Sequence, residues 1–309
     1  MLPMGLTLAL TGATGFVGGH VLAAAQTAGH RIRALTRRPQ PPRAGVDWVP
    51  GDLADQTSLE RLVAGADVVV HVAGVTNALD TAAFMAGNAA GSQAMVRAAG
   101  TRPFVHVSSL AARTPRLSAY GASKAHGEDA VRAHAGPFVI VRPPAVYGPA
   151  DTQLVPVFRA ARRGFLPLPA GQRAAFLYAP DLAQALVALA QDLVGDGRSA
   201  GGTYEIDDGA EGYDARALAQ AFGQALGRRV RALTVPPVLL RAGGRVATAW
   251  ARLTGGLPPL SSDRARYLAH RDWTADSGPL RALGLWRPAT PLAQGLALTA
   301  AWYRRQGWL

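Results

Sequence analysis

The stretch TGATGFVGGH, residues 11–20, carries the glycine spacing that decides the fold. Gly12, Gly15 and Gly18 stand directly between a short apolar run, LTLAL, and a helix-like segment, HVLAAAQTAG. Glycine permits a sharp turn and lets the backbone approach a pyrophosphate, while the following helix presents free N–H groups to the anion. The stretch therefore predicts a dinucleotide-binding loop. A glycine-rich turn without a ligand is the alternative.

Outward from this loop, valine-rich runs alternate with helix-like segments through the first half of the chain. The runs are RIRAL (31–35), DVVVHVAG (67–74), FVHVSSL (104–110) and FVIVRPPAVYGP (138–149). Apolar strands separated by helices are typical of a parallel sheet that is covered on both faces. The sequence predicts an α/β fold with a doubly wound parallel sheet, a Rossmann fold.

The predicted domains divide the chain near its middle. Residues 1–150 are expected to form a dinucleotide-binding Rossmann domain, to which residues 174–208 return, and residues 151–309 mainly form a smaller C-terminal substrate-binding domain. Because ligands gather outside the carboxyl ends of parallel strands, the strand exits should converge on one cleft. These exits lie at Thr11–Gly18, Thr36–Arg38, Asp52, Ala73–Gly74, Ser108–Ser109 and Arg142–Gly148.

The second strand exit reads ALTRRP, with Arg37 and Arg38 and no acidic residue nearby. A guanidinium suits a ribose 2′-phosphate through charge-assisted hydrogen bonds, whereas NAD-binding folds place a carboxylate against the 2′-hydroxyl. NADP is therefore predicted as the cofactor in preference to NAD. The alternative is a solvated arginine pair, since arginine is common throughout this chain.

The segment SAYGASKAHGE, residues 118–128, contains the only lysine in the sequence, Lys124. Tyr120 precedes it by four residues, so the two side chains share one face of a helix. An ammonium near a phenol stabilises the phenolate and lowers the tyrosine pKa from about 10 toward the working pH, which suits a general acid or base. Ser109, at the preceding strand exit, is placed to hydrogen-bond the reacting oxygen. A surface-helix pair without a function is the alternative.

Composition argues against several classes of protein. The formal net charge is +12, but it is spread as +5 on residues 1–150 and +7 on residues 151–309, and no nucleic-acid-binding motif is present. We therefore expect no nucleic-acid partner. The chain has no cysteine, and its seven histidines show no metal-ligand spacing, so no metal site is predicted.

The beginning of the chain is apolar, with Arg31 as its first charged residue. Glycines interrupt this stretch and no basic region precedes it, so the sequence predicts neither a targeting peptide nor stable membrane insertion. We expect a cytoplasmic protein with a small-molecule substrate. The oligomeric state stays open, with a homodimer as one option.

Together these motifs resemble the short-chain dehydrogenase/reductase superfamily, in particular its extended branch, the NAD-dependent epimerase/dehydratase family. TGATGFVG resembles the glycine motif, GDL the adenine-contacting segment, HVAG the strand beside the nicotinamide ribose, and RPPAVYGP the segment that flanks the nicotinamide. By this resemblance, Ser109 binds the reacting oxygen, Tyr120 is the general acid/base, and Lys124 binds the ribose and lowers the tyrosine pKa. The implied cofactor contacts are Gly12, Thr14, Gly15, Phe16, Val17, Gly18, Arg37, Arg38, Asp52, Leu53, Ala73, Lys124 and Pro143.

The sequence departs from the family pattern at several positions, and these departures disfavour some of the family's activities. Ser109 and Tyr120 are only 11 positions apart, without the long insertion of many sugar-nucleotide members. The segment between them has no Asp or Glu, where the family's dehydratases place a carboxylate, which disfavours dehydration. Asn88 resembles a helix asparagine that often supports the active site, whereas Asp181 is interpreted as an acid at a helix N-terminus.

Residues 235–260 mix Leu, Val and Trp250 with arginines, as an amphipathic cover over a cleft would, and their apolar content suggests a lipophilic substrate. An ordinary packed helix and attachment to a membrane surface are alternatives.

Three functions stay open. They are an NADP-dependent reductase or dehydrogenase acting on a carbonyl/alcohol pair of a small, apolar molecule, a sugar-nucleotide epimerase, and a redox-silent dinucleotide-binding assembly or sensor protein. The complete Ser/Tyr/Lys set counts against the third.

Overall fold

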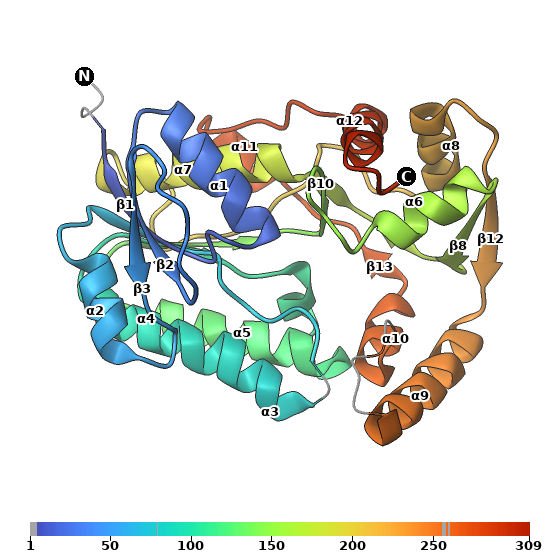
Figure 1. The fold of residues 1–309 in the computed structure, drawn as a ribbon, viewed down its shortest axis with the longest axis horizontal. Helices are drawn as coiled ribbons and strands as arrows, with labels where there is room; N and C mark the ends of the chain where they lie inside the picture. Colours follow the sequence, from blue (N-terminus) through green and yellow to red (C-terminus); the bar gives the residue numbers. More distant parts are fainter. Residues whose placement is uncertain (1–4, 79, 255–257, 259) are drawn as a thin grey trace. The chain divides into compact units, whose positions relative to one another are not determined.

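The computed structural model describes residues 5–78, 80–254, 258 and 260–309, and divides the chain into two compact units (Figure 1). Unit 1 comprises residues 1–143, 180–206 and 277–287, and unit 2 comprises residues 144–179, 207–276 and 288–309. Residues 255–257 and 259, within the segment expected to cover a cleft, lie outside the described residues.

Unit 1 is built on a seven-stranded sheet in which every neighbouring pair is parallel. The strand order is β11-β6-β5-β4-β1-β2-β3, so the order reverses between β1 and β4. The strands are β1 (Thr7–Thr11), β2 (Arg31–Thr36), β3 (Val46–Pro50), β4 (Val68–His71), β5 (Phe104–Val107), β6 (Phe138–Arg142) and β11 (Thr203–Glu205). This arrangement confirms the predicted doubly wound sheet, whose ligand site is expected at the point of reversal.

Helices cover both faces of this sheet, as its apolar strands require. Helices α1 (Phe16–Thr27) and α7 (Ala179–Val194) lie on one face, and α2 (Gln56–Val63), α4 (Gly91–Ala99) and α5 (Ala119–Arg132) lie on the other (Figure 1). Short helices α3 (Thr81–Phe84) and α11 (Gly278–Ala282) complete the unit, and a π-helical turn, η1 (Met85–Ala90), joins α3 to α4. Two 3-10 turns, η2 (Leu110–Arg113) and η3 (Pro115–Leu117), lead into α5.

Local signals in the sequence set where the helices of unit 1 begin. The Ser118 side chain accepts a hydrogen bond from Gly121 N at 3.0 Å and caps α5, and Asp55 caps α2 through Thr57 N. The apolar faces of α2 and α4 then pack on the sheet around fully buried Leu59 and Met95. This packing fixes the position of α5 and of the strand exits beside it.

Over its described residues, unit 2 contains three short parallel strand pairs and five helices. The pairs are β7 (Ala145–Tyr147) with β10 (Phe176–Tyr178), β8 (Phe165–Pro169) with β12 (Arg231–Val235), and β9 (Arg173–Ala174) with β13 (Asp272–Trp273). The helices are α6 (Val155–Arg162), α8 (Ala215–Leu226), α9 (Pro237–Thr254), α10 (Ser262–Leu268) and α12 (Leu292–Arg305). Phe158 centres the core of this unit, with its ring 4.9 Å from Phe222 and 5.1 Å from Tyr303 in edge-on contacts.

The boundaries of the two units differ in part from the domain boundaries that the sequence predicts. Residues 174–208 were expected to return to the Rossmann domain, and within them residues 180–206 belong to unit 1, whereas β10 belongs to unit 2. Residues 277–287, expected in the C-terminal domain, also belong to unit 1, where α11 contacts β11. Within the described ranges, no helix is both long and apolar enough to cross a membrane.

Candidate active site

The loop between β1 and α1 is shaped by glycines in the way that a bound pyrophosphate requires. Gly12 has a φ of +76°, and a Cβ there would lie 2.8 Å from Ala73 N. A Cβ at Gly18 would overlap Gly12 O. Gly15 caps α1 without a side-chain hydrogen bond, and the first turn of the helix has no acidic residue. The open N-terminus and the close backbone packing therefore fit a dinucleotide phosphate group.

The other predicted cofactor contacts follow the carboxyl ends of neighbouring strands in unit 1. Arg37 and Arg38 follow β2, and both are exposed. Asp52 lies beyond β3, where its Oδ1 accepts a hydrogen bond from Ala54 N at 3.0 Å. Ala73 N, beyond β4, donates to Thr11 Oγ1 at 3.2 Å, and Pro143 O, beyond β6, accepts from Leu110 N at 3.0 Å. Since all of these strands are parallel, these residues share one edge of the sheet.

Ser109 and Tyr120 meet at this edge. Ser109 follows β5, Tyr120 lies in the first turn of α5, and their side chains are hydrogen-bonded. Burial raises the pKa of Tyr120, and the hydrogen bond with Ser109 offsets this increase only in part. The expectation from sequence, a pKa lowered by Lys124, is therefore not what this structure shows.

Lys124 lies one turn further along α5 and is buried, with 5% of its surface exposed. Its Nζ donates a hydrogen bond to Val107 O at 2.7 Å. The same Nζ lies 3.8 Å from the position that a Cβ on Gly74 would occupy, so the lysine reaches the segment that follows β4. Burial lowers the pKa of Lys124 to about 8, and the carboxylate of Glu128 acts in the opposite direction.

Asn88, on the π-helical turn η1, ties this segment to α5. Its Oδ1 accepts from Val75 N at 2.7 Å, and its Nδ2 donates to Val75 O at 2.9 Å and to Ser123 Oγ at 2.8 Å. The three bonds hold the backbone after β4 beside the helix that carries Tyr120 and Lys124. A π-turn at this position is typical of a functional site.

A buried carboxylate, Glu128, was not recognised from the sequence. Its side chain is 1% exposed and accepts hydrogen bonds from Ser108 Oγ at 2.5 Å and from Arg142 Nε at 2.8 Å. Arg132 donates to its other oxygen at 2.7 Å. Burial alone would raise the pKa of Glu128, but the hydrogen bonds from Arg142, Ser108 and Arg132 outweigh burial and lower it. Glu128 therefore joins α5 to the exits of β5 and β6.

Two histidines stack on the adjacent strands β4 and β5, near the carboxyl ends of both. The rings of His71 and His106 are 5.5 Å apart and nearly parallel. His71 is bonded to Thr11 Oγ1 at 2.7 Å, whereas neither ring nitrogen of His106 has a hydrogen-bond partner within the described part of the chain. Burial, and secondly the charge of Lys124, lower the pKa of His71 to about 3 and the pKa of His106 well below its ordinary value. Both rings are therefore neutral at physiological pH.

We expect His106→Leu to raise the free energy of unfolding by about 1 kcal/mol or more, because it removes two buried polar atoms that lack partners. It should also weaken the acid sensitivity of the fold. Below about pH 6.5, the ordinary histidine pKa, the two histidines become protonated in the unfolded chain but stay neutral in the folded one. The free energy of unfolding therefore falls as the pH is lowered. Urea unfolding at several pH values measures both effects. His126→Leu, at an exposed position on α5, is the control, and equal effects of the two substitutions would contradict the prediction.

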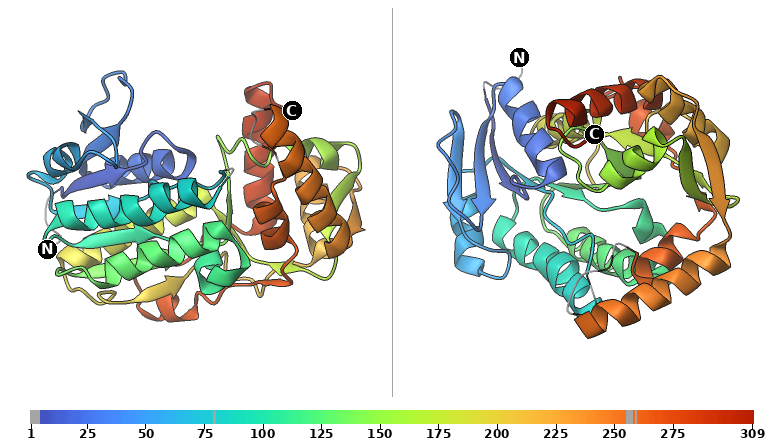
Figure 2. Two further views of the ribbon diagram at one scale, coloured as in Figure 1. Left: turned by 90° about the horizontal axis from the view of Figure 1, so that it is seen from below. Right: turned by 45° about the vertical axis from the view of Figure 1, so that its right-hand side comes forward.

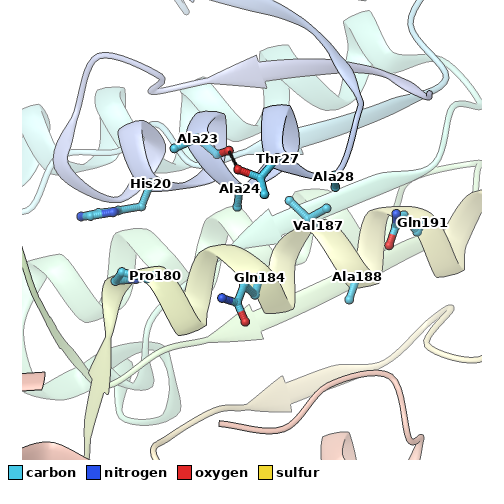
Figure 3. A pocket seen from close by; sticks show the side chains of 10 residues that line it. All are labelled: His20, Ala23, Ala24, Thr27, Ala28, Pro180, Gln184, Val187, Ala188 and Gln191. Carbon is cyan, nitrogen blue, oxygen red and sulfur yellow. Dashed lines mark hydrogen bonds between the residues drawn. The ribbon is translucent and has the colours of Figure 1, made fainter. Parts of the chain in front are cut away.

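A groove of about 450 Å³ lies between α1 and α7 (Figure 3). Its walls carry Ala23, Ala24, Ala28 and Ala188, with His20 and Pro180 at one end. None of the predicted site residues lines it, and neither does any arginine or carboxylate. The groove therefore lacks the groups that would bind a dinucleotide phosphate. Within the described ranges, no three His, Asp or Glu side chains cluster as a metal site would require.

The sequence is similar to those of known proteins. The chain is 40% identical to a ceramide reductase from Caulobacter vibrioides (strain NA1000 / CB15N), over 98% of this chain and 96% of that protein. It is 26% identical to a 3 beta-hydroxysteroid dehydrogenase/Delta 5-->4-isomerase from Mycobacterium tuberculosis (strain CDC 1551 / Oshkosh), over 79% of this chain and 75% of that protein.

The fold is also similar to that of MoeE5, solved in complex with UDP-glucuronic acid and NAD. The TM-score is 0.74, with 20% sequence identity over 98% of this chain and 100% of that chain. The model of the NAD dependent epimerase/dehydratase family matches residues 8–206, which span the glycine loop, Ser109, Tyr120 and Lys124. The chain therefore belongs to the NAD dependent epimerase/dehydratase family.

Proposed function

We propose that this protein is an NADP-dependent reductase that interconverts a ketone and a secondary alcohol on a lipophilic molecule. The observation that carries the proposal is the hydrogen-bonded pair of Ser109 and Tyr120, with Lys124 one turn away on the same helix, at the sheet edge where the glycine loop lies. These groups can bind a carbonyl oxygen and give it a proton.

In the proposed reaction the chain positions the substrate and supplies the proton. When bound, the nicotinamide exchanges a hydride with the substrate carbon. Ser109 Oγ donates a hydrogen bond to the carbonyl oxygen, and Tyr120 Oη transfers its proton to that oxygen as negative charge develops there. The raised pKa of Tyr120 keeps the hydroxyl protonated at neutral pH, as an acid must be. The Lys124 ammonium stabilises the phenolate that remains until solvent returns the proton.

The proposed substrate class is inferred from the relatives of this chain. The relative with 40% identity over nearly the whole chain is a ceramide reductase, and another relative is a hydroxysteroid dehydrogenase. Ceramides and hydroxysteroids share a secondary alcohol on a largely apolar molecule, and the oxidised form of such an alcohol is a ketone. We infer that this chain acts on the ketone–alcohol pair of a long-chain lipid. An oxidised ceramide, in which the secondary alcohol has become a ketone, is the first substrate to test.

The reaction is tested by incubating the purified protein with NADPH and an oxidised ceramide, and by measuring loss of NADPH together with the alcohol formed. One alcohol formed for each NADPH consumed would support the proposal. Tightly copurifying dinucleotide, together with turnover of a sugar nucleotide without net NADPH oxidation, would overturn it in favour of an epimerase.

The preference for NADP is assigned to Arg37, which is exposed directly after β2. We expect Arg37→Ala to weaken NADPH binding about tenfold or more and to leave NADH binding within about twofold, because only NADPH offers a phosphate to the guanidinium. Titration of both cofactors measures the effect. Arg31→Ala, an exposed arginine at the other end of β2, is the matched control and should change neither affinity. Equal affinity of the wild type for NADH and NADPH would contradict this assignment.

A further inference from the structure

Helix α9 packs on its neighbour through one side only. That side includes buried Gly244 and Ala251 and lies against α10 (Figure 2). Thr248 Oγ1, on the same side, accepts a hydrogen bond from Ser262 N at 2.8 Å. Leu240, which is partly buried and lies one turn before Gly244, falls on the same side by helical spacing.

Five of the large apolar side chains of α9 lie on its opposite side and are exposed. We name these five the α9 stripe, with exposed fractions of 71% for Val238, 62% for Leu239, 71% for Val246, 68% for Trp250 and 83% for Leu253. At about 100° per residue they fall within roughly one third of the helix circumference, centred opposite Gly244. Contiguous exposed apolar surface of this kind marks an interaction site.

Positive charge borders the α9 stripe. Arg241 and Arg245 are exposed and, by the same helical spacing, lie side by side along one edge of the stripe. The sequence around them is one-sided in charge, because it holds seven arginines and no carboxylate between Asp214 and Asp263. A protein partner offering the usual mixture of charges would gain little from such a surface, whereas a uniformly anionic partner complements it.

We propose that the α9 stripe docks this protein onto the surface of an anionic phospholipid bilayer. In that position the aliphatic side chains and the Trp250 indole enter the boundary between headgroups and acyl chains, and α9 lies in the plane of the interface. Arg241 and Arg245 then face the lipid phosphates. The proposal goes beyond the proposed reaction, since it concerns where the protein works and stands on α9 alone.

The test is cosedimentation of the full chain with vesicles, without cofactor or substrate. We expect binding to vesicles of phosphatidylcholine mixed with phosphatidylglycerol, weaker binding when sodium chloride is added, and much weaker binding to phosphatidylcholine alone. The double substitution Trp250→Gln/Leu253→Gln should weaken binding about tenfold or more, because it removes two large apolar groups that are exposed. Leu298→Gln, at a position on α12 that is 46% exposed, is the matched control and should leave binding unchanged.

Three outcomes would overturn the proposal. They are no binding of the wild type to the anionic vesicles, equal loss of binding in the α9 and Leu298 variants, and a wild-type dimer that the α9 double substitution converts to a monomer while vesicle binding stays the same. The last outcome would assign the α9 stripe to a second copy of the chain. Because all these positions are exposed, unchanged circular dichroism is expected to show that the variants fold. This experiment measures vesicle binding alone. A negative result would therefore overturn membrane docking without affecting the proposed reaction, and a failure to reduce the ketone would not affect membrane docking.

Discussion

Replacing Tyr120 with phenylalanine should lower the rate of ketone reduction by about 10²- to 10⁴-fold, the usual contribution of a positioned general acid. The substitution removes one oxygen, which is hydrogen-bonded to Ser109, and leaves the ring that packs 5.9 Å from Phe84. The glycine loop and Arg37 are untouched. Binding of NADPH should therefore change by less than about twofold, since the lost hydroxyl acts on the substrate oxygen.

The rate and the affinity are measured separately, by NADPH oxidation and by titration of NADPH fluorescence. Tyr204→Phe is the matched control, because Tyr204 is another half-buried tyrosine of unit 1 but lies on strand β11. It should keep full activity. Retention of activity by Tyr120→Phe, or equal losses in both variants, would remove Tyr120 from the proposed chemistry.

Replacing Glu128 with alanine should lower the free energy of unfolding by about 3–5 kcal/mol, because it leaves a half-buried guanidinium without its partner. The Glu128 carboxylate holds Arg142 through two hydrogen bonds, of 2.8 and 2.6 Å, and also accepts from Ser108. The same network fixes the chain next to Ser109 and Pro143. Turnover should therefore fall as well, at temperatures where the variant is still folded.

The neighbouring carboxylate provides an internal control for this prediction. Asp129 lies beside Glu128 on α5 and bonds to Arg132 at 3.1 Å, but its side chain is 70% exposed. Asp129→Ala should lower the free energy of unfolding by less than about 1 kcal/mol, as expected of a solvated ion pair. Urea unfolding of both variants gives the comparison. Similarly small losses in the free energy of unfolding for the two variants would mean that burial of Glu128 does not increase its contribution to stability.

Much of the fold follows from patterns that are local in the sequence. The glycine spacing at Gly12, Gly15 and Gly18 and the valine-rich strands each depend on a few adjacent residues, and the structure places them as the sequence predicted. The helix that carries Tyr120 and Lys124 is likewise marked by the Ser118 cap before it. Such features can be inferred without knowing which elements meet.

The parts that could not be inferred depend on contacts between distant elements. Glu128 pairs with Arg142 across 14 positions, and only the placement of α5 against β6 brings them together. The one available signal was a carboxylate one turn beyond Lys124. The charge of Lys124 by itself predicts a lowered pKa for Tyr120, whereas burial, which depends on the whole packing around α5, raises that pKa. Two-residue strands such as β9 and β13 leave no periodic pattern at all.

The most direct test of the proposed reaction is to follow the hydride from NADPH to the product. With oxidised ceramide and NADPH that carries deuterium at the reactive position, we predict one deuterium on the carbinol carbon of each alcohol formed. The product should accumulate in step with NADP and should be nearly absent with Tyr120→Phe. Alcohol without deuterium, or product formed at the same rate by Tyr120→Phe, would show that this chain does not reduce its substrate by hydride transfer with Tyr120 as the acid.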